Sequence, residues 1–418
     1  MRASRDGAIP MAEIDFDAAS PGDAGFDADR LGEAVAFHRA HETAWPTSMY
    51  LADGRYVGTA SIGDRPEHAA VIGPVRPRGG PNGLVLRHGR VAAAWGDTRR
   101  PDMTFSISKS YLALLAGLAL ADGLVPGLDD PVAETVPGPW FASPHNAAVT
   151  WRHLLTLSSE WSGTLWGKPD VADHNRLVGA ADLPTAGKGE PRVLQRPGER
   201  FEYNDVRVNL LAACLTRRFG RPLPDVLRDR VMAPIGASPD WAWHGYEAAE
   251  VETENGPVRA VSGGGHWGGG LFIGSRDHAR MGLLVLRDGM WDGSQILPAG
   301  WVRQMMAPSR LNAGYGLLWW LNGDPGAPRY LGLPTDSVFA LGAGSNLVWI
   351  SRSLDLVVVL RWIDGAHVGG LLGRIAAAIL VDVPFLPLGE YLQPTAYSTG
   401  LKGVLKGMPL FWNVERAA

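Results

Sequence analysis

Several features that would mark an exported or disulfide-bonded protein are missing from the sequence. It holds a single cysteine, Cys214, in an apolar stretch, so an intramolecular disulfide is impossible and a buried small side chain is the simplest interpretation. The apolar run 112–120 is too short to span a bilayer and suits a buried helix. The first twenty residues show no apolar core of a signal peptide, so we predict a cytoplasmic protein with no membrane partner.

Runs of like charge and the motifs of several common sites are also missing. The formal net charge is -4, without a long basic or acidic run, which argues against a nucleic-acid partner and favours a small-molecule substrate. No His or Cys spacing typical of a metal site occurs, and neither a phosphate-binding glycine loop nor the G-x-S-x-G elbow of α/β-hydrolases is present. We therefore predict no metal and no cofactor, and the sequence leaves the oligomeric state open.

The 418 residues have an ordinary globular composition, with 46% hydrophobic and 20% charged residues, and their number suggests a two-lobed unit or two domains. Apolar spacing predicts helices at 25–41, 106–121, 206–218 and 370–381, a hairpin at 83–95, and late strands at 317–321, 346–350 and 356–362. The simplest architecture is one sheet built from both ends of the chain. Its predicted parts are an N-terminal extension (1–24), a sheet lobe (25–125 and 285–383), an inserted helical lobe (126–284) and a C-terminal tail (384–418).

A serine and a lysine lie three residues apart at the start of the second predicted helix. Ser106 and Lys109 therefore share one face of that helix. Apolar burial and the positive end of a helix favour the neutral amine of a lysine, which can then act as a general base. The 39 basic residues include only five lysines, and arginine cannot give up its proton in this role. We interpret Ser106 as a nucleophile and Lys109 as its proton-transfer partner; a solvated lysine at a surface helix start is the alternative.

A tyrosine precedes the third predicted helix. Tyr203 lies in the segment 197–205, in which a turn leads to a short extended piece. A tyrosine beside a lysine can pass a proton between a nucleophile and a leaving group. A tyrosine that only fills the core at a helix entry is the other interpretation.

Three stretches together resemble the serine β-lactamase and penicillin-recognising superfamily, in particular its class C-like esterase and amidase branch. They are FSISKS (105–110), PGERFEYND (197–205) and GGGLFIGSRDHARMGLLVL (268–286), which are similar to the family segments S-x-x-K, P-G-x-x-F-x-Y-[SN]-N and G-G-G-L-x-S-T-A-x-D-x-A-R-x-G. The resemblance implies an α+β fold of the serine β-lactamase/transpeptidase type. That fold has an antiparallel sheet flanked by helices plus an inserted helical lobe.

The resemblance also implies roles for individual residues. Ser106 attacks a carbonyl and forms an acyl-enzyme, while Lys109 and Tyr203 handle protons. The oxyanion would lie between the backbone N–H of Ser106 and a second N–H on the late edge strand. The candidates for that second donor are Gly342, Ala343 and Gly344.

Two positions depart from the family pattern. The edge-strand stretch 339–345 has no Lys or His, the cation that in the family usually contacts the carboxylate of a β-lactam. This absence puts β-lactamase activity in doubt and favours substrates without such a carboxylate. Asp205 stands at the last position of the Tyr-x-Asn motif, where its carboxylate either holds Lys109 charged or binds a substrate amine.

Further residues are candidates for the cleft and its substrate. The pair Trp319-Trp320 resembles a strand of the 6-aminohexanoate-dimer (nylon-oligomer) hydrolases, which suggests linear amides as one substrate class. His266 lies between glycines that allow close backbone approach, and Trp161 lies in a loop that faces the site in the family. A loop histidine and a core tryptophan are the alternative interpretations of these two residues.

The sequence as a whole predicts a serine hydrolase that cleaves small ester or amide substrates through an acyl-enzyme on Ser106. One alternative is an acyltransferase, in which an amine or an alcohol replaces water. Another is a weakly catalytic binding protein that keeps the fold. The intact set of Ser106, Lys109 and Tyr203 argues against the binding protein.

Overall fold

The computed structural model describes residues 11, 14–178, 187–323, 326–380, 401–402 and 415–416. The chain divides into two compact units, Met1–Ile379 and Leu380–Ala418. In the second unit, β16 (Leu401–Lys402) and β17 (Glu415–Arg416) pair antiparallel, and the rest of the predicted tail lies outside the described residues. All residues of the candidate site belong to the first unit.

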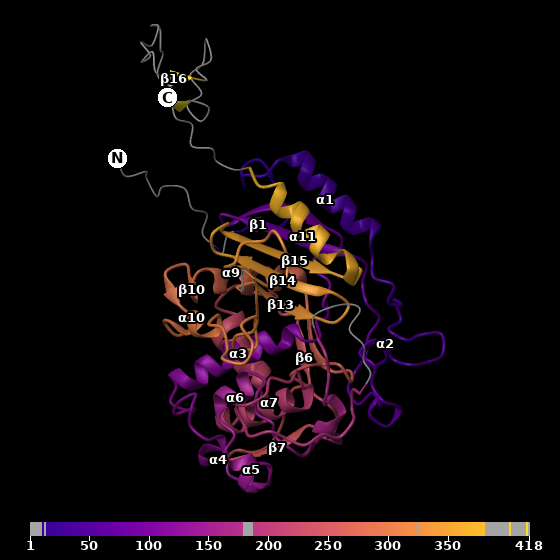
Figure 1. The fold of residues 1–418 in the computed structure, drawn as a ribbon, viewed down its shortest axis with the longest axis vertical. Helices are drawn as coiled ribbons and strands as arrows, with labels where there is room; N and C mark the ends of the chain where they lie inside the picture. Colours follow the sequence, from indigo (N-terminus) through magenta and orange to yellow (C-terminus); the bar gives the residue numbers. More distant parts are fainter. Residues whose placement is uncertain are drawn as a thin grey trace. The chain divides into compact units, whose positions relative to one another are not determined.

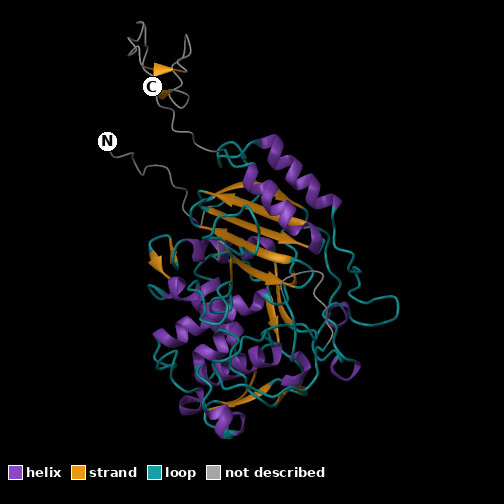
Figure 2. Cartoon of the chain, viewed as in Figure 1, coloured by secondary structure: helices purple, strands orange, loops and turns teal. Residues whose placement is uncertain are grey.

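The first unit is built around a six-stranded antiparallel sheet, drawn as arrows in Figure 1 and in orange in Figure 2, with the strand order β12-β13-β14-β15-β1-β2. Its strands are β1 (Asn82–Arg87), β2 (Arg90–Trp95), β12 (Trp320–Leu321), β13 (Val338–Gly342), β14 (Asn346–Ser351) and β15 (Leu356–Arg361). The early hairpin adds to the late strands, with Leu84 of β1 opposite Val359 of β15. The prediction of one sheet built from both ends of the chain is therefore confirmed.

Two predicted elements have different bounds in the structure. Strand β12 is shorter than the predicted 317–321, because Leu318 has φ 59° and its N–H donates to the carbonyl oxygen of Leu155 instead of to a strand. Helix α11 (Val368–Ala377) ends before the predicted residue 381, and Ile379 beyond it forms a bridge with Phe26.

Helices cover both faces of the sheet. Helix α1 (Ala28–Ala40) packs with α11 on one face, and α9 (Ser275–Leu286) packs on β14, β15 and β1 on the other (Figure 1). Glycine at Gly282 allows this close packing, since a Cβ there would lie 2.6 Å from a methyl group of Val357. Helix α9 begins within the segment 126–284 that was predicted to form the helical lobe, but it packs on the sheet.

The middle of the chain forms a mostly helical region around α7 (Asp205–Phe219), which packs on α3 (Ile107–Ala121). Beside it lies a three-stranded sheet with the order β3-β9-β6. The remaining strands are β3 (Asp102–Met103), β4 (Thr164–Leu165), β5 (Lys168–Pro169), β6 (Ala242–His244), β7 (Glu250–Thr253), β8 (Gly256–Arg259), β9 (Gly270–Ile273), β10 (Met290–Trp291) and β11 (Ser294–Gln295). The remaining helices are α2 (Val57–Ala60), α4 (Val132–Thr135), α5 (Pro144–Ala147), α6 (Trp151–Leu155), α8 (Leu223–Leu227) and α10 (Trp301–Met305), with short turns at η2 (Pro66–His68), η3 (Pro139–Phe141), η4 (Asp170–Asp173), η5 (Arg228–Met232) and η6 (Gly365–His367).

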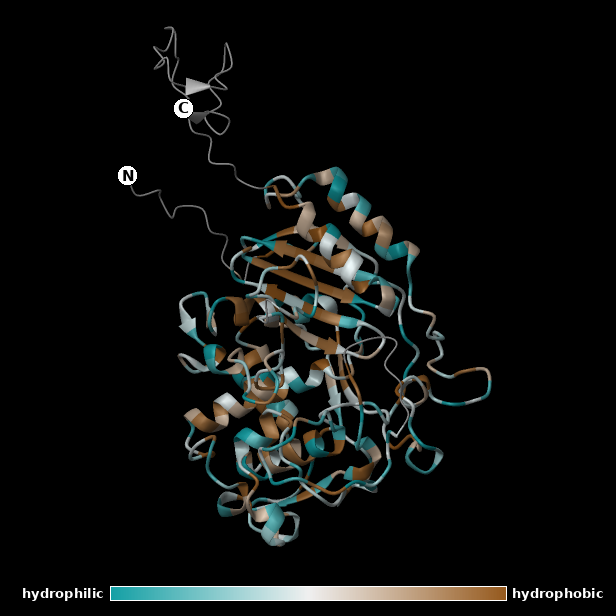
Figure 3. Cartoon of the chain, in the orientation of Figure 1, coloured by the Kyte–Doolittle hydropathy of each residue, from teal (hydrophilic) through white to brown (hydrophobic). Residues whose placement is uncertain are grey.

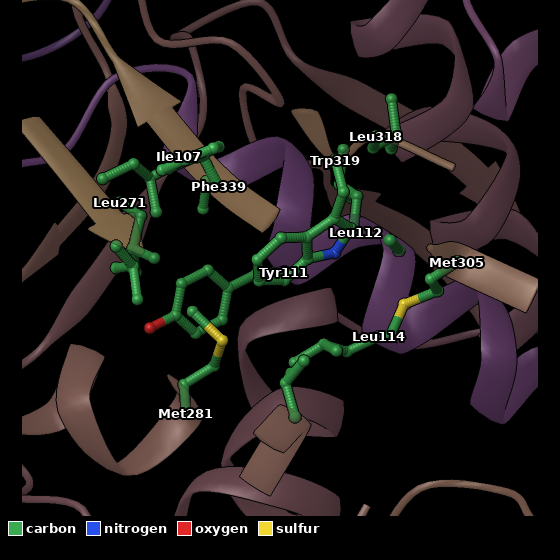
Figure 4. Close-up of a cluster of buried hydrophobic side chains, with 14 of the residues drawn as sticks. Ile107, Tyr111, Leu112, Leu114, Leu271, Met281, Met305, Leu318, Trp319 and Phe339 are labelled. Atoms are coloured by element: carbon green, nitrogen blue, oxygen red, sulfur yellow. The ribbon is translucent and has the colours of Figure 1, made fainter. Parts of the chain in front are cut away.

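Helix α3 is buried from Ile107 to Ala119. Leucine and alanine, both strong helix formers, dominate its sequence. Figure 4 shows Tyr111 of α3 near Met281 of α9, in a cluster that also contains Phe339 of β13. Burying such side chains stabilises the fold by roughly 1.5–3 kcal/mol each. Figure 3 shows the same apolar character in the strands of the sheet, and this shared core fixes the N-terminal end of α3.

Two smaller predictions can be compared with the structure. Cys214 is fully buried in α7, which confirms its interpretation as a small core residue. Among the helices of the described residues, none is long and apolar enough to cross a membrane.

Candidate active site

Ser106 lies directly before the first residue of α3 and makes no capping hydrogen bond to the helix with its side chain. The Oγ is therefore left for other contacts. The Nζ of Lys109, one helical turn further along, lies 2.7 Å from this Oγ. Lys109 is only 1% exposed, whereas Ser106 is partly exposed. The structure thus brings the serine and the lysine together at the end of a rigid helix.

The backbone before Ser106 is held in an unusual conformation. Phe105 has φ 51°, a region that residues with a side chain rarely adopt and that often occurs at functional sites. Strand β13 passes so close that a Cβ on Gly342 would collide with the carbonyl oxygen of Thr104. Only glycine permits this approach. The turn before Ser106 and the edge strand are thereby fixed next to each other.

The edge strand offers backbone donors beside Ser106. Strand β13 pairs with β12 over two residues at its start, so its later part has a free edge among the described strands. Gly342, Ala343 and Gly344 all line one pocket together with Ser106. The turn that follows is fixed by Asn346, whose Nδ2 donates to the carbonyl oxygen of Ala343 at 2.7 Å. The structure therefore brings these three residues into the same pocket as Ser106.

Tyr203 is positioned by the cap of α7. The Asn204 side chain accepts hydrogen bonds from two backbone N–H groups of the first turn, which leaves Tyr203 just outside the helix. The Nζ of Lys109 lies 4.7 Å from the centroid of the Tyr203 ring, and the guanidinium of Arg176 lies 5.0 Å from it. Tyr203 also lines the pocket of Ser106. The structure therefore places the Tyr203 ring beside two cations and in the same pocket as Ser106.

Asp205 is the centre of a buried ion-pair cluster. Its carboxylate lies 2.5 Å from the Nζ of Lys109, 2.8 Å from Arg176 and 2.5 Å from the Nδ1 of His266. Burial alone raises the pKa of a carboxyl, but these three neighbours hold the pKa of Asp205 well below its usual range. Of the two roles considered for Asp205, the geometry matches the ion pair with Lys109. The ammonium of Lys109 then donates a hydrogen bond to Ser106.

The cluster continues away from the pocket. The Nε2 of His266 lies 3.0 Å from Asp64, and Lys188 contacts Asp64 and lies 3.2 Å from Asp173. Burial disfavours a charged imidazole, but the carboxylates of Asp64, Asp173 and Asp205 raise the pKa of His266 above its ordinary value of 6.5. Ligand atoms of Asp64, Asp173 and His266 lie within 4.8 Å of one another, a spacing that suits a cation. The ammonium of Lys188 already supplies positive charge at this point.

Two side chains predicted for the cleft do not line the pocket. His266 is 2% exposed and lies between Asp205 and Asp64, behind the pocket wall. Trp161 is 1% exposed, and its Nε1 donates to the carbonyl oxygen of Trp140 at 2.7 Å. The core interpretation therefore fits Trp161. His266 is neither a cleft residue nor an exposed loop residue, because buried carboxylates hold both of its ring nitrogens.

The pocket that contains Ser106 has a volume of about 560 Å³, which suits a small ester or amide. The edge strand supplies no cation to it, as the sequence predicts. Arginines from other segments do reach it, namely Arg176 and Arg329. No local motif marks either residue, since each arrives at the pocket only through the fold. Sequence reasoning considered the edge strand alone and therefore missed both.

The chain can now be compared with known proteins. The Beta-lactamase family profile matches residues 84–362, a span that includes Ser106, Lys109 and Tyr203. The match covers more than half of the chain, and the protein therefore belongs to the beta-lactamase family. It is a hydrolase of that family with the serine β-lactamase-like α+β fold.

Solved structures share this fold. EstCE1, described as a hydrolase with promiscuous acyltransferase activity, matches with a TM-score of 0.54 and 17% identity over 85% of this chain and 99% of its own. A putative beta-lactamase from Bacteroides dorei DSM 17855 matches with a TM-score of 0.53 and 16% identity over 72% of this chain and 93% of its own. A putative 6-aminohexanoate-dimer hydrolase from Bacillus anthracis matches with a TM-score of 0.48 and 14% identity over 82% and 88%, a likeness that supports no conclusion about substrate. No curated protein sequence matches the chain.

Proposed function

We propose that this protein is a serine hydrolase that cleaves small esters or amides through an acyl-enzyme on Ser106. The observation that supports the proposal most directly is the 2.7 Å contact between the Nζ of Lys109 and the Oγ of Ser106 in a pocket of about 560 Å³. The free edge of β13 lies in the same pocket. These contacts support a nucleophile with a proton-handling partner beside it, and the edge strand is the proposed source of a backbone donor for the carbonyl oxygen.

In the proposed reaction, the Oγ of Ser106 attacks the carbonyl carbon of the substrate. Because Asp205 holds Lys109 as an ammonium ion, Lys109 is suited to donate a hydrogen bond, and Tyr203 is the candidate that accepts the serine proton. The proton then moves to the leaving oxygen or nitrogen as its bond to the carbonyl carbon breaks. Water attacks the acyl-enzyme in the same way, which releases the acid and restores Ser106.

Charge on the carbonyl oxygen is expected to be stabilised by two backbone N–H groups. One belongs to Ser106, at the positive end of the α3 dipole. The other belongs to the 342–344 stretch of the edge strand. Fixed donors of this kind stabilise the transition state because they do not have to reorient as charge develops.

Linear amides belong to the proposed substrate range because Trp319-Trp320 resembles a strand of the 6-aminohexanoate-dimer hydrolases. Only Trp320 of this pair lines the pocket, while Trp319 is fully buried. Trp320 stacks on Tyr203, with 5.6 Å between the ring centroids. A substrate group that contacts Trp320 would therefore lie beside the proposed proton acceptor.

A fluorophosphonate probe tests the nucleophile directly. Intact-mass measurement is expected to show one probe group on the wild-type protein and none on Ser106→Ala. A panel of p-nitrophenyl esters and anilides then identifies the bond that is cleaved. No labelling of the wild type together with no turnover on the panel would contradict the proposal and favour a binding protein on this fold.

Acyl transfer is a second candidate function, since the same acyl-enzyme can react with an amine or an alcohol in place of water. The description of EstCE1 as a hydrolase with promiscuous acyltransferase activity favours testing it. The test adds a primary amine or alcohol to the ester assay and measures the products. New amide or ester in excess of free acid would establish transfer, and free acid alone would establish hydrolysis.

A further inference from the structure

One cation in the wall of the pocket has no carboxylate partner in the described part of the chain. The charged side chains of the pocket are Arg176, Arg329 and Asp364. Arg176 is paired with Asp205 at 2.8 Å, and Asp364 lies 3.3 Å from His367. Arg329 makes no ion pair with any described residue. The pocket thus presents a guanidinium that no described carboxylate contacts.

Arg329 is packed against aromatic rings with a polar atom left unpaired. Its guanidinium carbon lies 3.9 Å from the centroid of the Trp320 ring, and the phenol of Tyr330 is its polar neighbour. The Nε is buried and has no hydrogen-bond partner among the residues that the structure describes. Burial lowers the pKa of Arg329, as expected for a cation that has lost water without gaining an anion.

The backbone that bears Arg329 is firmly held. Asn322, fully buried just after β12, accepts a hydrogen bond from the N–H of Tyr330 at 2.8 Å. The Nδ2 of Asn322 donates in return to three carbonyl oxygens, including that of Tyr330, each at 3.2 Å. The planar guanidinium, with its rigid fork of N–H donors, is therefore presented from a fixed loop.

We propose that Arg329 binds a carboxylate of the substrate, so that the ester or amide cleaved at Ser106 has a negatively charged end. This inference rests on the proposed function for the position of the scissile bond. Trp320 connects the two places, because its ring stacks on Tyr203 and on Arg329. A carboxylate that accepts N–H bonds from the guanidinium would place the rest of the substrate along this wall, toward Ser106.

The proposed anchor differs in position from the edge-strand cation that the sequence lacks. Arg329 comes from the connection between β12 and β13, whereas the family cation is expected on β13 itself. The expectation of substrates without a carboxylate was drawn from β13 alone. A cation from a neighbouring segment changes that expectation, because the pocket has a partner for a carboxylate after all.

Matched esters test the proposal. Mono(p-nitrophenyl) esters of succinic, glutaric and adipic acid are compared with methyl-capped twins, which have the same chain without the charge. The wild type is expected to prefer the charged member, at one chain length at least, by about tenfold or more in kcat/KM, as for a hydrogen bond between charged groups. Arg329→Gln is expected to remove this preference while the capped twin reacts at nearly the wild-type rate.

Arg374→Gln is the matched control. Arg374 also stacks on an aromatic ring, 4.4 Å from the centroid of Phe37, but it is not among the residues that line the pocket. This variant is expected to keep the preference for the charged ester. Equal losses on the charged and capped esters in Arg329→Gln would assign Arg329 to packing alone and overturn the proposal, as would a wild type with no preference at any chain length.

A binding measurement separates this proposal from the proposed function. Titration calorimetry with Ser106→Ala, and with Ser106→Ala combined with Arg329→Gln, measures the affinity for the same esters without turnover. Tighter binding of the charged ester that disappears with Arg329 supports the carboxylate site even where no ester is cleaved. Cleavage of both esters without such a difference supports the hydrolase and rejects the carboxylate site.

Discussion

Two buried ion clusters meet the start of α7, and only one of them contacts the pocket. The first, called the site cluster, consists of Asp64, Lys109, Asp173, Arg176, Lys188, Asp205 and His266. The second, called the back cluster, consists of Glu160, Asp170, Arg192, Glu202 and Arg207. Both clusters are buried and combine carboxylates with basic side chains. Comparing them therefore shows which further contact distinguishes the site cluster.

The back cluster is closed on itself. Arg207, 2% exposed, lies 3.1 Å from Glu160, 3.2 Å from Glu202 and 3.2 Å from Asp170. Arg192 lies 2.6 Å from Glu202 and 2.5 Å from Glu160. Burial raises the pKa of a carboxyl, but the two arginines lower the pKa of Glu160 to about 2. Each of the three carboxylates contacts at least one of the two arginines inside the protein, which fits a role in holding the helical region together.

The site cluster ends at Ser106, the proposed nucleophile, instead. Lys109 contacts Asp205 with one part of its ammonium group and Ser106 with another. A change in the site cluster should therefore alter the reaction, whereas a change in the back cluster should alter stability. Burial and ion pairing occur in both, so they do not by themselves mark a site. What distinguishes the site cluster is its contact with Ser106, the proposed nucleophile, which lines the pocket.

The largest expected effect is that of Ser106→Ala on catalysis. Removing the Oγ should lower kcat by roughly 10⁴-fold or more, because no acyl-enzyme can form. The free energy of unfolding should change by less than about 1 kcal/mol, since Ser106 is partly exposed and its side chain does not cap α3. Ester turnover and urea unfolding of the purified variant measure both quantities. Wild-type turnover would show that another residue is the nucleophile.

Breaking the back cluster should lower the free energy of unfolding and leave the reaction rate of the folded protein nearly unchanged. Arg207→Met leaves buried carboxylates without their guanidinium and should lower the free energy of unfolding by about 3–5 kcal/mol. The kcat of the folded protein should stay close to that of the wild type. Arg352→Met is the control, because its pair with Asp288 is exposed and should contribute at most about 1 kcal/mol. Equal losses in the two variants would remove the distinction between buried and exposed pairs.

Lys109→Arg changes the site cluster while it keeps the charge. Arginine keeps the charge and can pair with Asp205, but its planar guanidinium cannot contact Asp205 and Ser106 from a single nitrogen as the Nζ of Lys109 does, so kcat/KM should fall by roughly 10²-fold or more. Lys168→Arg is the control, since Lys168 is buried and donates to the carbonyl oxygens of His68 and Ala70. That variant should keep its activity per folded molecule. Retained activity in Lys109→Arg would mean that only positive charge is needed beside Ser106.

The smallest effect concerns the pH dependence of stability. The pKa of His266 is raised above 6.5 in the folded protein, so its stabilising charge is fully present below pH 6.5 and is lost as the pH rises through the folded value. Between these two values the free energy of unfolding should fall by about 1.4 kcal/mol per pH unit relative to His266→Gln. Urea unfolding of both proteins from pH 6 to pH 9 measures this difference. Parallel curves would show that His266 is uncharged in its pocket of carboxylates.

Much of the fold was accessible from the sequence because its signals are local. Apolar periodicity predicted α1, α3, α7 and α11, and the late strands follow turn residues that mark their ends. Strand β12 was predicted too long, because the contact of Leu318 with Leu155 joins segments far apart in the chain. Such a contact overrides the local pattern and has no signature within it.

The candidate site was also predictable only where its signals are local. The pairing of Ser106 with Lys109 could be predicted because side chains three residues apart on a helix lie on the same face. Arg329 has no such neighbour, and nothing in its surrounding sequence distinguishes it from the other arginines of the chain. His266 was expected near the cleft from its flanking glycines, but Asp64 and Asp205, distant in sequence, hold it behind the pocket wall. Partners that come from distant segments are the part that the sequence alone does not reveal.

The clamp at Asn322 has a consequence for how specificity changes in this fold. Its side chain connects the beginning of the β12–β13 connection to Tyr330 through two hydrogen bonds. Ser106 and Lys109 lie at the start of α3 and Tyr203 lies just before α7, so these three residues are outside this connection. Exchange of the β12–β13 connection, in evolution or in the laboratory, would then replace Arg329 and the proposed charge preference without changing Ser106. The proposed carboxylate site and the proposed nucleophile therefore lie on separate segments of the chain, and each segment can change without the other.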